Sequence, residues 1–187
     1  RNPSEWIIRF APLVREGGPV LDLAAGGGRY GRYFLERGNP VTLVDRQTEA
    51  LLDLEPDPGA TVVQADLEDG SPWPLNEKYA GVVVVNYLHR PLTENLLESL
   101  EPGGLLIYET FARGNENFSR PRNPDHLLKS GELLQMVLGR LQVIAYEHGI
   151  REKSPLPGVI QRICAVNNLD QSVREDRKPQ ELNLEPK

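Results

Sequence analysis

Acidic residues that follow apolar runs, together with a glycine-rich segment, could hold a nucleoside. The segment 21–28 reads LDLAAGGG, which places Asp22 two residues before a turn that contains Gly26 and Gly28. Glycines at such a turn let the backbone approach a ligand closely. Asp45 ends the next apolar run, where its two oxygens could accept hydrogen bonds from ribose hydroxyls. The glycine spacing by itself also fits a dinucleotide such as NAD.

Asp22 favours a cationic nucleoside over NAD. A buried carboxylate needs a cationic or hydrogen-bonding partner, because leaving it unpaired costs free energy. The amino-acid portion of S-adenosylmethionine supplies such a partner, whereas NAD has no equivalent group and its pyrophosphate would be repelled. We therefore expect S-adenosyl-L-methionine as the cofactor and S-adenosyl-L-homocysteine as its product. An NAD-dependent oxidoreductase remains an alternative that Asp22 argues against.

The chain alternates between short apolar runs and helical patterns, and these elements must position the acidic residues. Strands are expected at 20–24, 41–44, 61–64, 79–85 and 105–111, with a terminal hairpin at 141–147 and 159–166. Helices are expected near 4–10, 29–37, 48–54, 91–100 and 130–138. The pattern predicts an α/β fold with a doubly wound, mostly parallel seven-stranded sheet that ends in an antiparallel hairpin. Ligands collect at the carboxyl ends of the strands in such a sheet.

Local signals mark the ends of several elements. Ser4 and Ser130 are expected to cap the first and the last helix. The run Pro102-Gly103-Gly104 is expected to form the turn that leads into the fifth strand. Residues 112–129 are rich in Asn, Arg and Pro, which is typical of a long polar loop, and long ordered loops often carry function.

Composition and charge favour one globular domain. The 187 residues are 39% hydrophobic and carry a formal net charge of -6. We expect a single domain over residues 1–169 and a disordered or extended polar tail over 170–187. The acidic surface disfavours nucleic acid as a partner, and no apolar run reaches the roughly 20 residues of a membrane-spanning helix. The single cysteine, Cys164, and the lack of clustered metal ligands lead us to expect a cytoplasmic protein without a metal.

Taken together, these segments resemble the class I S-adenosylmethionine-dependent methyltransferase superfamily, whose fold is Rossmann-like. The resemblance covers about residues 18–165 and includes an acid followed by a glycine-rich turn. It implies that Asp22, Ala24, Gly26 and Gly28 surround the methionine part of the cofactor. Ala24 stands where the family usually has a glycine.

The resemblance continues at the ends of the next strands. It implies that Asp45 holds both ribose hydroxyls and that Arg46 lies near the adenine. The run Ala65-Asp66-Leu67 matches the third motif, in which the acid reaches the adenine amino group and the neighbouring backbone amide faces the ring. Asn86 matches the position that faces the reacting methyl group.

Within that superfamily the chain is similar to small bacterial enzymes grouped near the tellurite-resistance methyltransferases. The similarity lies in the segments 86–91 (NYLHRP), 108–111 (YETF), 114–118 (GNENF) and 122–125 (RNPD). It implies methyl transfer by in-line displacement. Positioning supplies much of the acceleration in such a reaction, and no metal is required.

Several side chains are expected beside the acceptor, where the fourth and fifth strands end. His89 is the candidate general base, because an imidazole is well suited to proton transfer near neutral pH, and the alternative is a surface or capping residue. Arg90 could clamp an anionic acceptor or pair with Glu109. Tyr87, Tyr108 and Glu109 complete the expected acceptor contacts. Loop residues that could line a lid over the acceptor are Asn115, Arg120 and Arg122.

The sequence thus predicts methyl transfer from S-adenosylmethionine to a small-molecule acceptor. One alternative is a protein that binds the cofactor without transferring a methyl group. Another is a methyltransferase that acts on protein or RNA, although the acidic surface and the absence of an appended recognition domain favour a small molecule.

Overall fold

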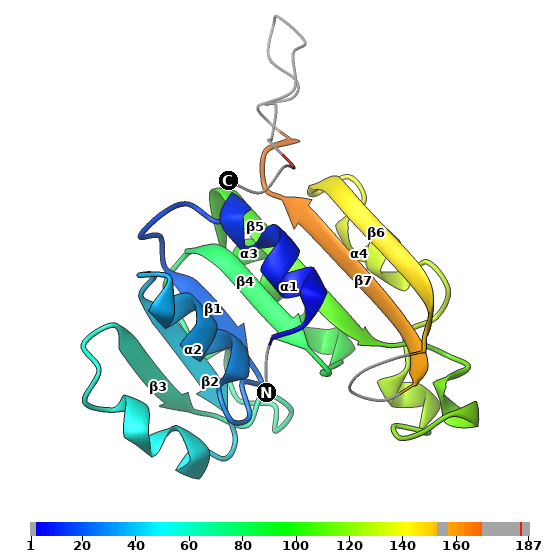
Figure 1. Cartoon of the computed structure of the whole chain (residues 1–187), viewed down its shortest axis with the longest axis horizontal. Coiled ribbons are helices and arrows are strands. Elements are labelled where there is room, and N and C mark those ends of the chain that lie inside the picture. Colours follow the sequence, from blue (N-terminus) through cyan, green and yellow to red (C-terminus); the bar gives the residue numbers. More distant parts are fainter. Residues whose placement is uncertain (1–2, 153–156, 170–183, 185–187) are drawn as a thin grey trace, which may run out of the picture.

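Seven strands form a single sheet in the computed structural model, which describes residues 3–152, 157–169 and 184. Their order is β3-β2-β1-β4-β5-β7-β6 (Figure 1). Strands β1 to β5 are parallel, and β7 lies antiparallel between β5 and β6. This confirms the doubly wound, mostly parallel seven-stranded sheet with a terminal antiparallel hairpin. The strands are β1 (Val20–Leu23), β2 (Val41–Asp45), β3 (Ala60–Gln64), β4 (Tyr79–Val85), β5 (Leu100–Phe111), β6 (Gln142–Arg151) and β7 (Gly158–Val166).

Helices cover both faces of the sheet (Figure 1). One face carries α1 (Glu5–Phe10), α2 (Arg29–Glu36) and the 3-10 turns η1 (Ala11–Leu13) and η2 (Glu49–Leu54), and the opposite face carries η3 (Arg90–Leu92), α3 (Thr93–Glu98) and α4 (Glu132–Val137). Each layer has its own hydrophobic core. All seven residues of β4 are buried, as expected for a parallel strand that is packed on both sides. No helix in the described part of the chain combines the length and apolarity needed to cross a membrane.

The strand order reverses direction at β1. The chain runs from β1 outward to β2 and β3, and then returns to place β4 on the other side of β1. At such a switch point the connections leave on opposite faces, so a crevice opens outside the carboxyl ends of the two central strands. The fold therefore places a ligand site beyond Leu23 of β1 and Val85 of β4.

Two local expectations were wrong. Ser130 does not cap α4, because Gly131 occupies the N-cap position with φ 71° and no side chain caps the helix there. The run 102–104 is not a turn before β5 but lies within it, at a register shift opposite Tyr79 and Gly81. The expected tail over 170–187 falls outside the described residues, apart from residue 184.

The first helix packs against the sheet as its sequence predicts. Ser4 caps α1 by accepting the N–H of Ile7 at 3.3 Å. Trp6 is buried, lies edge-on to Phe10 and donates its indole N–H to the carbonyl oxygen of Ile163 in β7 at 3.2 Å. This contact ties the start of the chain to the penultimate strand of the sheet order.

Truncation of Trp6 is therefore expected to be costly. Trp6→Ala removes a buried ring and its hydrogen bond to the carbonyl of Ile163, so the free energy of unfolding in urea is expected to fall by about 3–5 kcal/mol. Ile8→Ala, on the exposed side of the same helix, is the matched control and is expected to change it by about 0.5 kcal/mol or less. Equal losses in the two variants would contradict the packing of α1 on the sheet.

Candidate functional site

Two adjoining pockets open where β1 and β4 end. Their volumes are about 600 and 670 Å³, and Ala24 and Asn86 line both. Each of these residues directly follows its strand and has a left-handed backbone, with φ 54° for Ala24 and 55° for Asn86. That conformation is unfavourable for residues with a side chain, and such strain is often found where a backbone is shaped around a ligand. We call the 600 Å³ cavity the first pocket and the 670 Å³ cavity the second pocket.

The second pocket is built on the glycine-rich turn between β1 and α2. Asp22 is buried at the end of β1, and its Oδ2 accepts the N–H of Gly31 at 2.7 Å. A Cβ at Gly31 would lie 2.4 Å from Leu43 Cδ2, so only glycine lets α2 approach the sheet this closely. Gly26, with φ 55° and open space around it, lines the pocket. Gly28 lines neither pocket, and a Cβ at this position would lie 2.7 Å from Leu51 Cδ2.

Asp22 is an unusual carboxylate. Burial raises its pKa to about 7, the Gly31 hydrogen bond opposes this effect, and the charge of Asp45 raises the pKa further. No cationic side chain in the described part of the chain pairs with it. Asp22 thus anchors the turn, and it also lines a pocket in which a cation would stabilise its charged form.

Carboxylates line one end of the first pocket. Asp45 accepts the N–H of Gly26 through Oδ2 at 2.8 Å and that of Gln47 through Oδ1 at 2.9 Å. These bonds fix the carboxylate, and each oxygen can still accept a second hydrogen bond. The other predicted residues at this end are Arg46, Ala65, Asp66 and Leu67, and all of them line the first pocket.

The opposite end of the first pocket comes from segments that follow β4 and β5. Tyr87 and Leu88 follow β4, Thr110 and Phe111 end β5, and Pro121 and His126 belong to the loop beyond it. The sequence assigned only Tyr87 of these six residues to the site. The only signal for Pro121 and His126 was the length of the polar loop.

His89 lies outside both pockets. Its Nδ1 is 3.3 Å from Glu68 Oε1, and it lines a neighbouring hollow together with Trp73 and Pro91. His89 precedes η3 with an extended backbone, and its side chain meets the loop after β3. The structure therefore gives no contact between the expected general base and the cleft beside Asn86.

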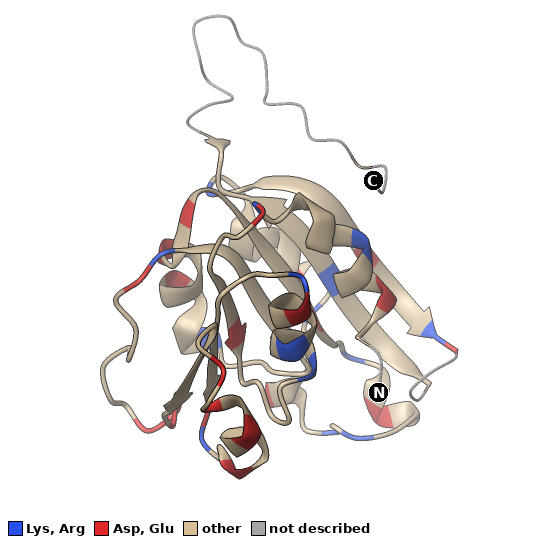
Figure 2. Cartoon of the chain, turned by 60° about the vertical axis from the view of Figure 1, so that its left-hand side comes forward, with Lys and Arg blue, Asp and Glu red and all other residues tan. Residues whose placement is uncertain are grey.

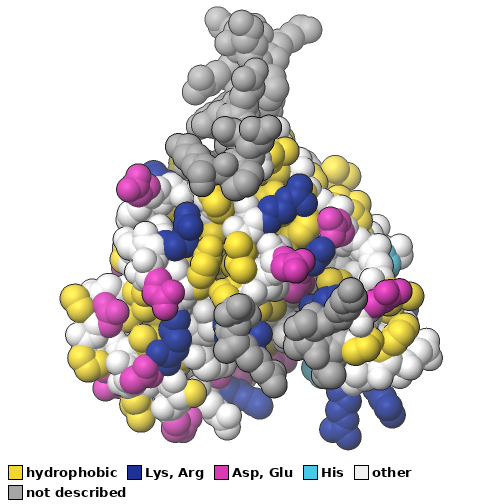
Figure 3. Space-filling model, in the orientation of Figure 1, with side chains coloured by type: hydrophobic (Ala, Val, Ile, Leu, Met, Phe, Trp, Pro, Cys, Tyr) yellow, Lys and Arg dark blue, Asp and Glu magenta, His cyan; other side chains and the backbone are white. Residues whose placement is uncertain are grey.

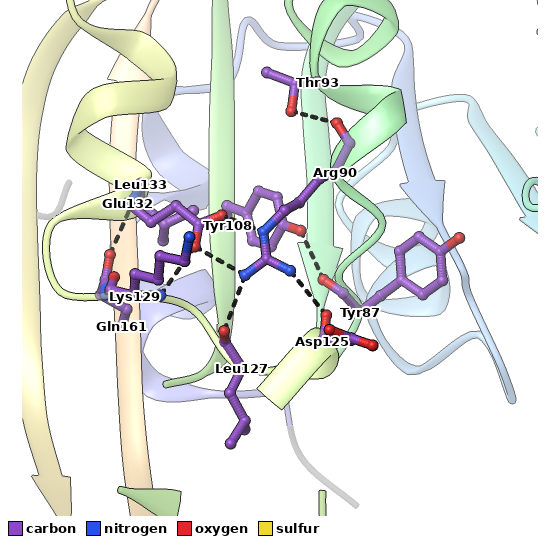
Figure 4. A network of polar contacts seen from close by, with 10 residues as sticks. All are labelled: Tyr87, Arg90, Thr93, Tyr108, Asp125, Leu127, Lys129, Glu132, Leu133 and Gln161. Atoms are coloured by element: carbon purple, nitrogen blue, oxygen red, sulfur yellow. Dashed lines mark hydrogen bonds and ion pairs between the residues drawn. The ribbon is translucent and has the colours of Figure 1, made fainter. Parts of the chain in front are cut away.

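Arg90 forms an ion pair with Glu132 of α4 and not with Glu109. Its Nε and Nη2 donate to the two Glu132 oxygens at 2.8 and 2.9 Å, and Figure 4 shows the guanidinium enclosed by these and other contacts. Glu109 is buried and lies 3.3 Å from Arg162 and 3.6 Å from Arg151. Neither Arg90 nor Glu109 lines the two pockets, so the expected acceptor clamp is absent from the described cleft.

Of the two expected tyrosines, only Tyr87 reaches the first pocket. Tyr108 is buried and donates its hydroxyl to the carbonyl oxygen of Tyr87 at 2.7 Å (Figure 4). Burial and the nearby carboxylate of Glu68 raise the pKa of the Tyr87 phenol above its usual range, so the phenol keeps its proton at neutral pH. Tyr108 thus supports the pocket wall from behind.

The expected lid residues have different surroundings. Asn115 is fully buried, donates to the carbonyl oxygens of Ser119 and Pro121, and accepts the N–H of Val159. It therefore holds the loop in shape and does not face the cleft. Arg120 and Arg122 are exposed and line neither pocket.

Charged residues of both signs are spread over the molecule, and they are interspersed on most elements of the ribbon (Figure 2). Lys and Arg side chains project from the lower edge of the molecule in Figure 3, the edge at which the parallel strands end in Figure 1. Of the charged residues that line the first pocket, Asp45, Asp66 and Glu68 are acidic and Arg46 is basic.

Solved structures share this fold. No family model matches the sequence, and no curated protein matches it at a significant level. TehB from Haemophilus influenzae superposes with a TM-score of 0.74 at 16% identity, covering 89% of this chain, which spans 63% of the length of TehB. The N-methyltransferase NodS from Bradyrhizobium japonicum gives 0.63 at 14% identity, covering 86% of this chain and 93% of its own.

A third structure contains a bound nucleoside. It is 1,6-didemethyltoxoflavin-N1-methyltransferase from Burkholderia thailandensis, with 1,6-didemethyltoxoflavin and S-adenosylhomocysteine bound. Its TM-score is 0.62 at 21% identity, covering 87% of this chain and 76% of its own. With the strand order and the cleft at the β1–β4 switch point, these likenesses show that the chain has the fold of the class I S-adenosylmethionine-dependent methyltransferases, a fold it shares with TehB.

Proposed function

We propose that the chain transfers a methyl group from S-adenosylmethionine to a small-molecule acceptor. The observation that carries this proposal is the pair of left-handed residues, Ala24 and Asn86, at which a pocket with a buried carboxylate meets a pocket with exposed ones. A nucleoside that carries a cationic amino-acid chain fits this division of charge. The shared fold of solved methyltransferases, some of them with S-adenosylhomocysteine bound, supports the same cofactor.

The residues of the two pockets divide into three groups in this proposal. Asp22, Ala24 and Gly26 would hold the amino-acid chain in the second pocket. Asp45 would accept both ribose hydroxyls, because its oxygens are fixed by backbone N–H groups and retain free lone pairs. Residues that would surround the adenine are Arg46, Ala65, Asp66 and Leu67, and Asn86 would lie beside the transferred methyl.

Positioning is the main task of the chain in this reaction. The bound cofactor supplies an activated methyl group on a sulfonium. The protein must hold an acceptor in line with that methyl and exclude water, and this requires rigid walls on both sides of Asn86. The first pocket extends past Asn86 to Tyr87, Thr110 and Phe111, which leaves space for a small acceptor next to the nucleoside.

Binding measurements test the proposed cofactor. Calorimetry is expected to detect binding of S-adenosylhomocysteine and no binding of NAD. Asp45→Asn is expected to lower the affinity for S-adenosylhomocysteine by about ten- to hundredfold, because hydrogen bonds to a charged group are lost. Glu94→Gln, which alters an exposed ion pair with Arg140, is the control and is expected to bind normally. Binding of NAD alone would overturn the proposal.

The unusual carboxylate gives a prediction for stability against pH. With a folded pKa of about 7 against the usual 3.8, Asp22 favours folding only while it is protonated. Its ionisation opposes folding increasingly between pH 4 and pH 7, and above pH 7 the cost levels at about 4 kcal/mol. Asp22→Asn keeps an acceptor for the N–H of Gly31 but carries no charge. Without ligand, its free energy of unfolding is therefore expected to exceed that of wild type by about 2–4 kcal/mol at pH 8 and to lie within about 1 kcal/mol of it at pH 4.

The same variant separates the two roles of Asp22. If the carboxylate pairs with the cationic chain, Asp22→Asn loses most of the stabilisation that S-adenosylhomocysteine gives to wild type in thermal unfolding. If Asp22 only anchors the turn, the variant keeps that stabilisation in full, and the proposed contact is wrong.

Turnover distinguishes an enzyme from a cofactor-binding protein. A labelled-methyl assay with thiol, phenol, amine and oxyanion acceptors is expected to give product with at least one small molecule and none with bulk protein or RNA. Tight nucleoside binding without any labelled product would instead support the binding protein.

A further inference from the structure

We propose that His126 receives the proton of a protic acceptor during methyl transfer, and that Arg90 is the positioning residue that holds His126 at the first pocket. This inference rests on the proposed function and extends it to the acceptor. It specifies acceptors that carry an N–H, O–H or S–H group at the atom to be methylated.

His126 is placed where an acceptor would lie. It ends the 3-10 turn η5 (Pro124–His126) and lines the first pocket with Thr110 and Phe111, at the end of β5. Within the described ranges its imidazole forms no hydrogen bond or ion pair, so its nitrogens are free to take a proton. It is the only one of the three histidines of the chain that lines either pocket.

One guanidinium fixes the backbone on both sides of His126. Arg90 Nη1 donates to the carbonyl oxygen of Asp125 at 2.9 Å, and Nη2 donates to that of Leu127 at 3.0 Å. Figure 4 shows the Arg90 side chain reaching between these two carbonyls and Glu132. The Glu132 carboxylate accepts hydrogen bonds from Nε and Nη2 of the same guanidinium, and its Oε1 also accepts the N–H of Lys129 at 2.9 Å. A planar guanidinium suits this bridging geometry, whereas an ammonium does not.

The segment after His126 is also anchored to β5. Leu127 and Leu128 are buried, and the N–H of Leu128 donates to the carbonyl oxygen of Phe111 at 3.0 Å. The N–H of Arg113 donates in turn to the carbonyl oxygen of Leu128 at 2.9 Å. The pocket rim that carries His126 is therefore an extension of the sheet and not a free loop.

Other ionisable groups at the first pocket are less suited to take the proton. The Tyr87 phenol already holds its own proton at neutral pH. Asp45 is committed to two backbone N–H groups, and Asp66 accepts the N–H of Glu68. Glu68 lines the pocket beside Tyr87, but its Oε1 already lies 3.3 Å from His89 Nδ1. His126 is the group on the acceptor side that has no competing partner in the described chain.

The step balances without a further reagent. A lone pair of the acceptor atom forms the bond to the methyl carbon, and the electrons of the carbon–sulfur bond leave with sulfur, which becomes a neutral thioether. The acceptor proton passes to the neutral imidazole of His126, which becomes imidazolium and later releases the proton to water. Other charged or titratable groups can affect the pH dependence of this proton transfer. Those that line the same pocket are Asp45, Arg46, Asp66, Glu68 and Tyr87, and Asp125 is adjacent to His126 in the chain.

The first test uses NMR and does not require turnover. The chain has three histidines, so single His→Gln variants assign each imidazole signal. Sinefungin carries an amine in place of the transferred methyl, and we expect it to move the His126 signals more than S-adenosylhomocysteine does, while the His148 signals stay in place. Unmoved His126 signals, with binding of sinefungin confirmed by calorimetry, would overturn the proposal. Failure of both nucleosides to bind would instead refute the proposed function.

The same spectra test the positioning role of Arg90. In Arg90→Gln, sinefungin is expected to bind with unchanged affinity and to leave the His126 signals near their free positions. Glu132→Gln, which loosens the guanidinium without removing it, is expected to show a weaker form of the same effect. Arg140→Gln breaks an exposed ion pair with Glu94 and is the control, with wild-type spectra. A wild-type response of His126 in both Arg90→Gln and Glu132→Gln would refute the positioning role.

Kinetics test the proton transfer itself, with catechol as an acceptor whose hydroxyl groups keep their protons at neutral pH. His126→Gln is expected to lower kcat by about a hundredfold or more with unchanged nucleoside affinity, and to lose the acidic limb of the rate–pH profile. Added imidazole is expected to restore part of the rate of His126→Gly. Arg90→Gln is expected to lose about ten- to hundredfold in kcat without such rescue, and Arg140→Gln to stay within about twofold. A wild-type kcat and pH profile in His126→Gln would overturn the proposal.

Discussion

The hydrogen bond from the N–H of Gly31 to the buried carboxylate of Asp22 joins the end of β1 to the first turn of α2. Because both partners are buried and the helix touches Leu43 directly at Gly31, the chain between them has little freedom. It must leave the sheet through a left-handed residue, Ala24, and return through the glycine turn. Asp45 then fixes the outer part of this turn by binding Gly26. The shape of the cleft follows from these two carboxylates and their backbone partners.

A cation bound beside Asp22 would couple folding to binding. A buried carboxylate without a cationic neighbour stores unfavourable free energy in the free protein. A cation in the second pocket would release that free energy, so part of the binding strength would come from relief of a cost already present in the fold. Raised pKa values of this kind are frequent at functional sites for the same reason. The strained backbones of Ala24 and Asn86 place a similar cost at the point where the pockets meet.

Local patterns in the sequence were sufficient to predict the sheet. Apolar runs of four to eight residues predicted the seven strands, and the uninterrupted valines of β4 indicated a central position. The same patterns placed Asp22, Asp45 and Asn86 at strand ends, where a doubly wound sheet collects ligands. Periodicity carries this information because it depends only on residues that are close in sequence.

The acceptor side could not be predicted in the same way. Arg90 finds its partner 42 residues away in Glu132, and Glu109 pairs with Arg162 at a distance of 53 residues. The sequence alone does not distinguish His89 from His126 as a candidate general base. Only the packing of the loop after β5 brings His126 to the cleft. Gly28 fits the motif by position, yet its neighbour is Leu51 from a later turn. No local signal records such long-range pairing.

The place of β7 inside the sheet has a consequence for synthesis on the ribosome. β7 follows β6 in the chain but separates it from β5, so the edge of β5 stays unpaired until nearly the whole domain has been made. Docking of the N-terminal helix is delayed in the same way, because the carbonyl that accepts the Trp6 indole N–H lies 157 residues downstream. Contacts this distant in sequence slow folding. A nascent chain truncated before Gly158 would therefore expose both an open strand edge and an undocked aromatic helix.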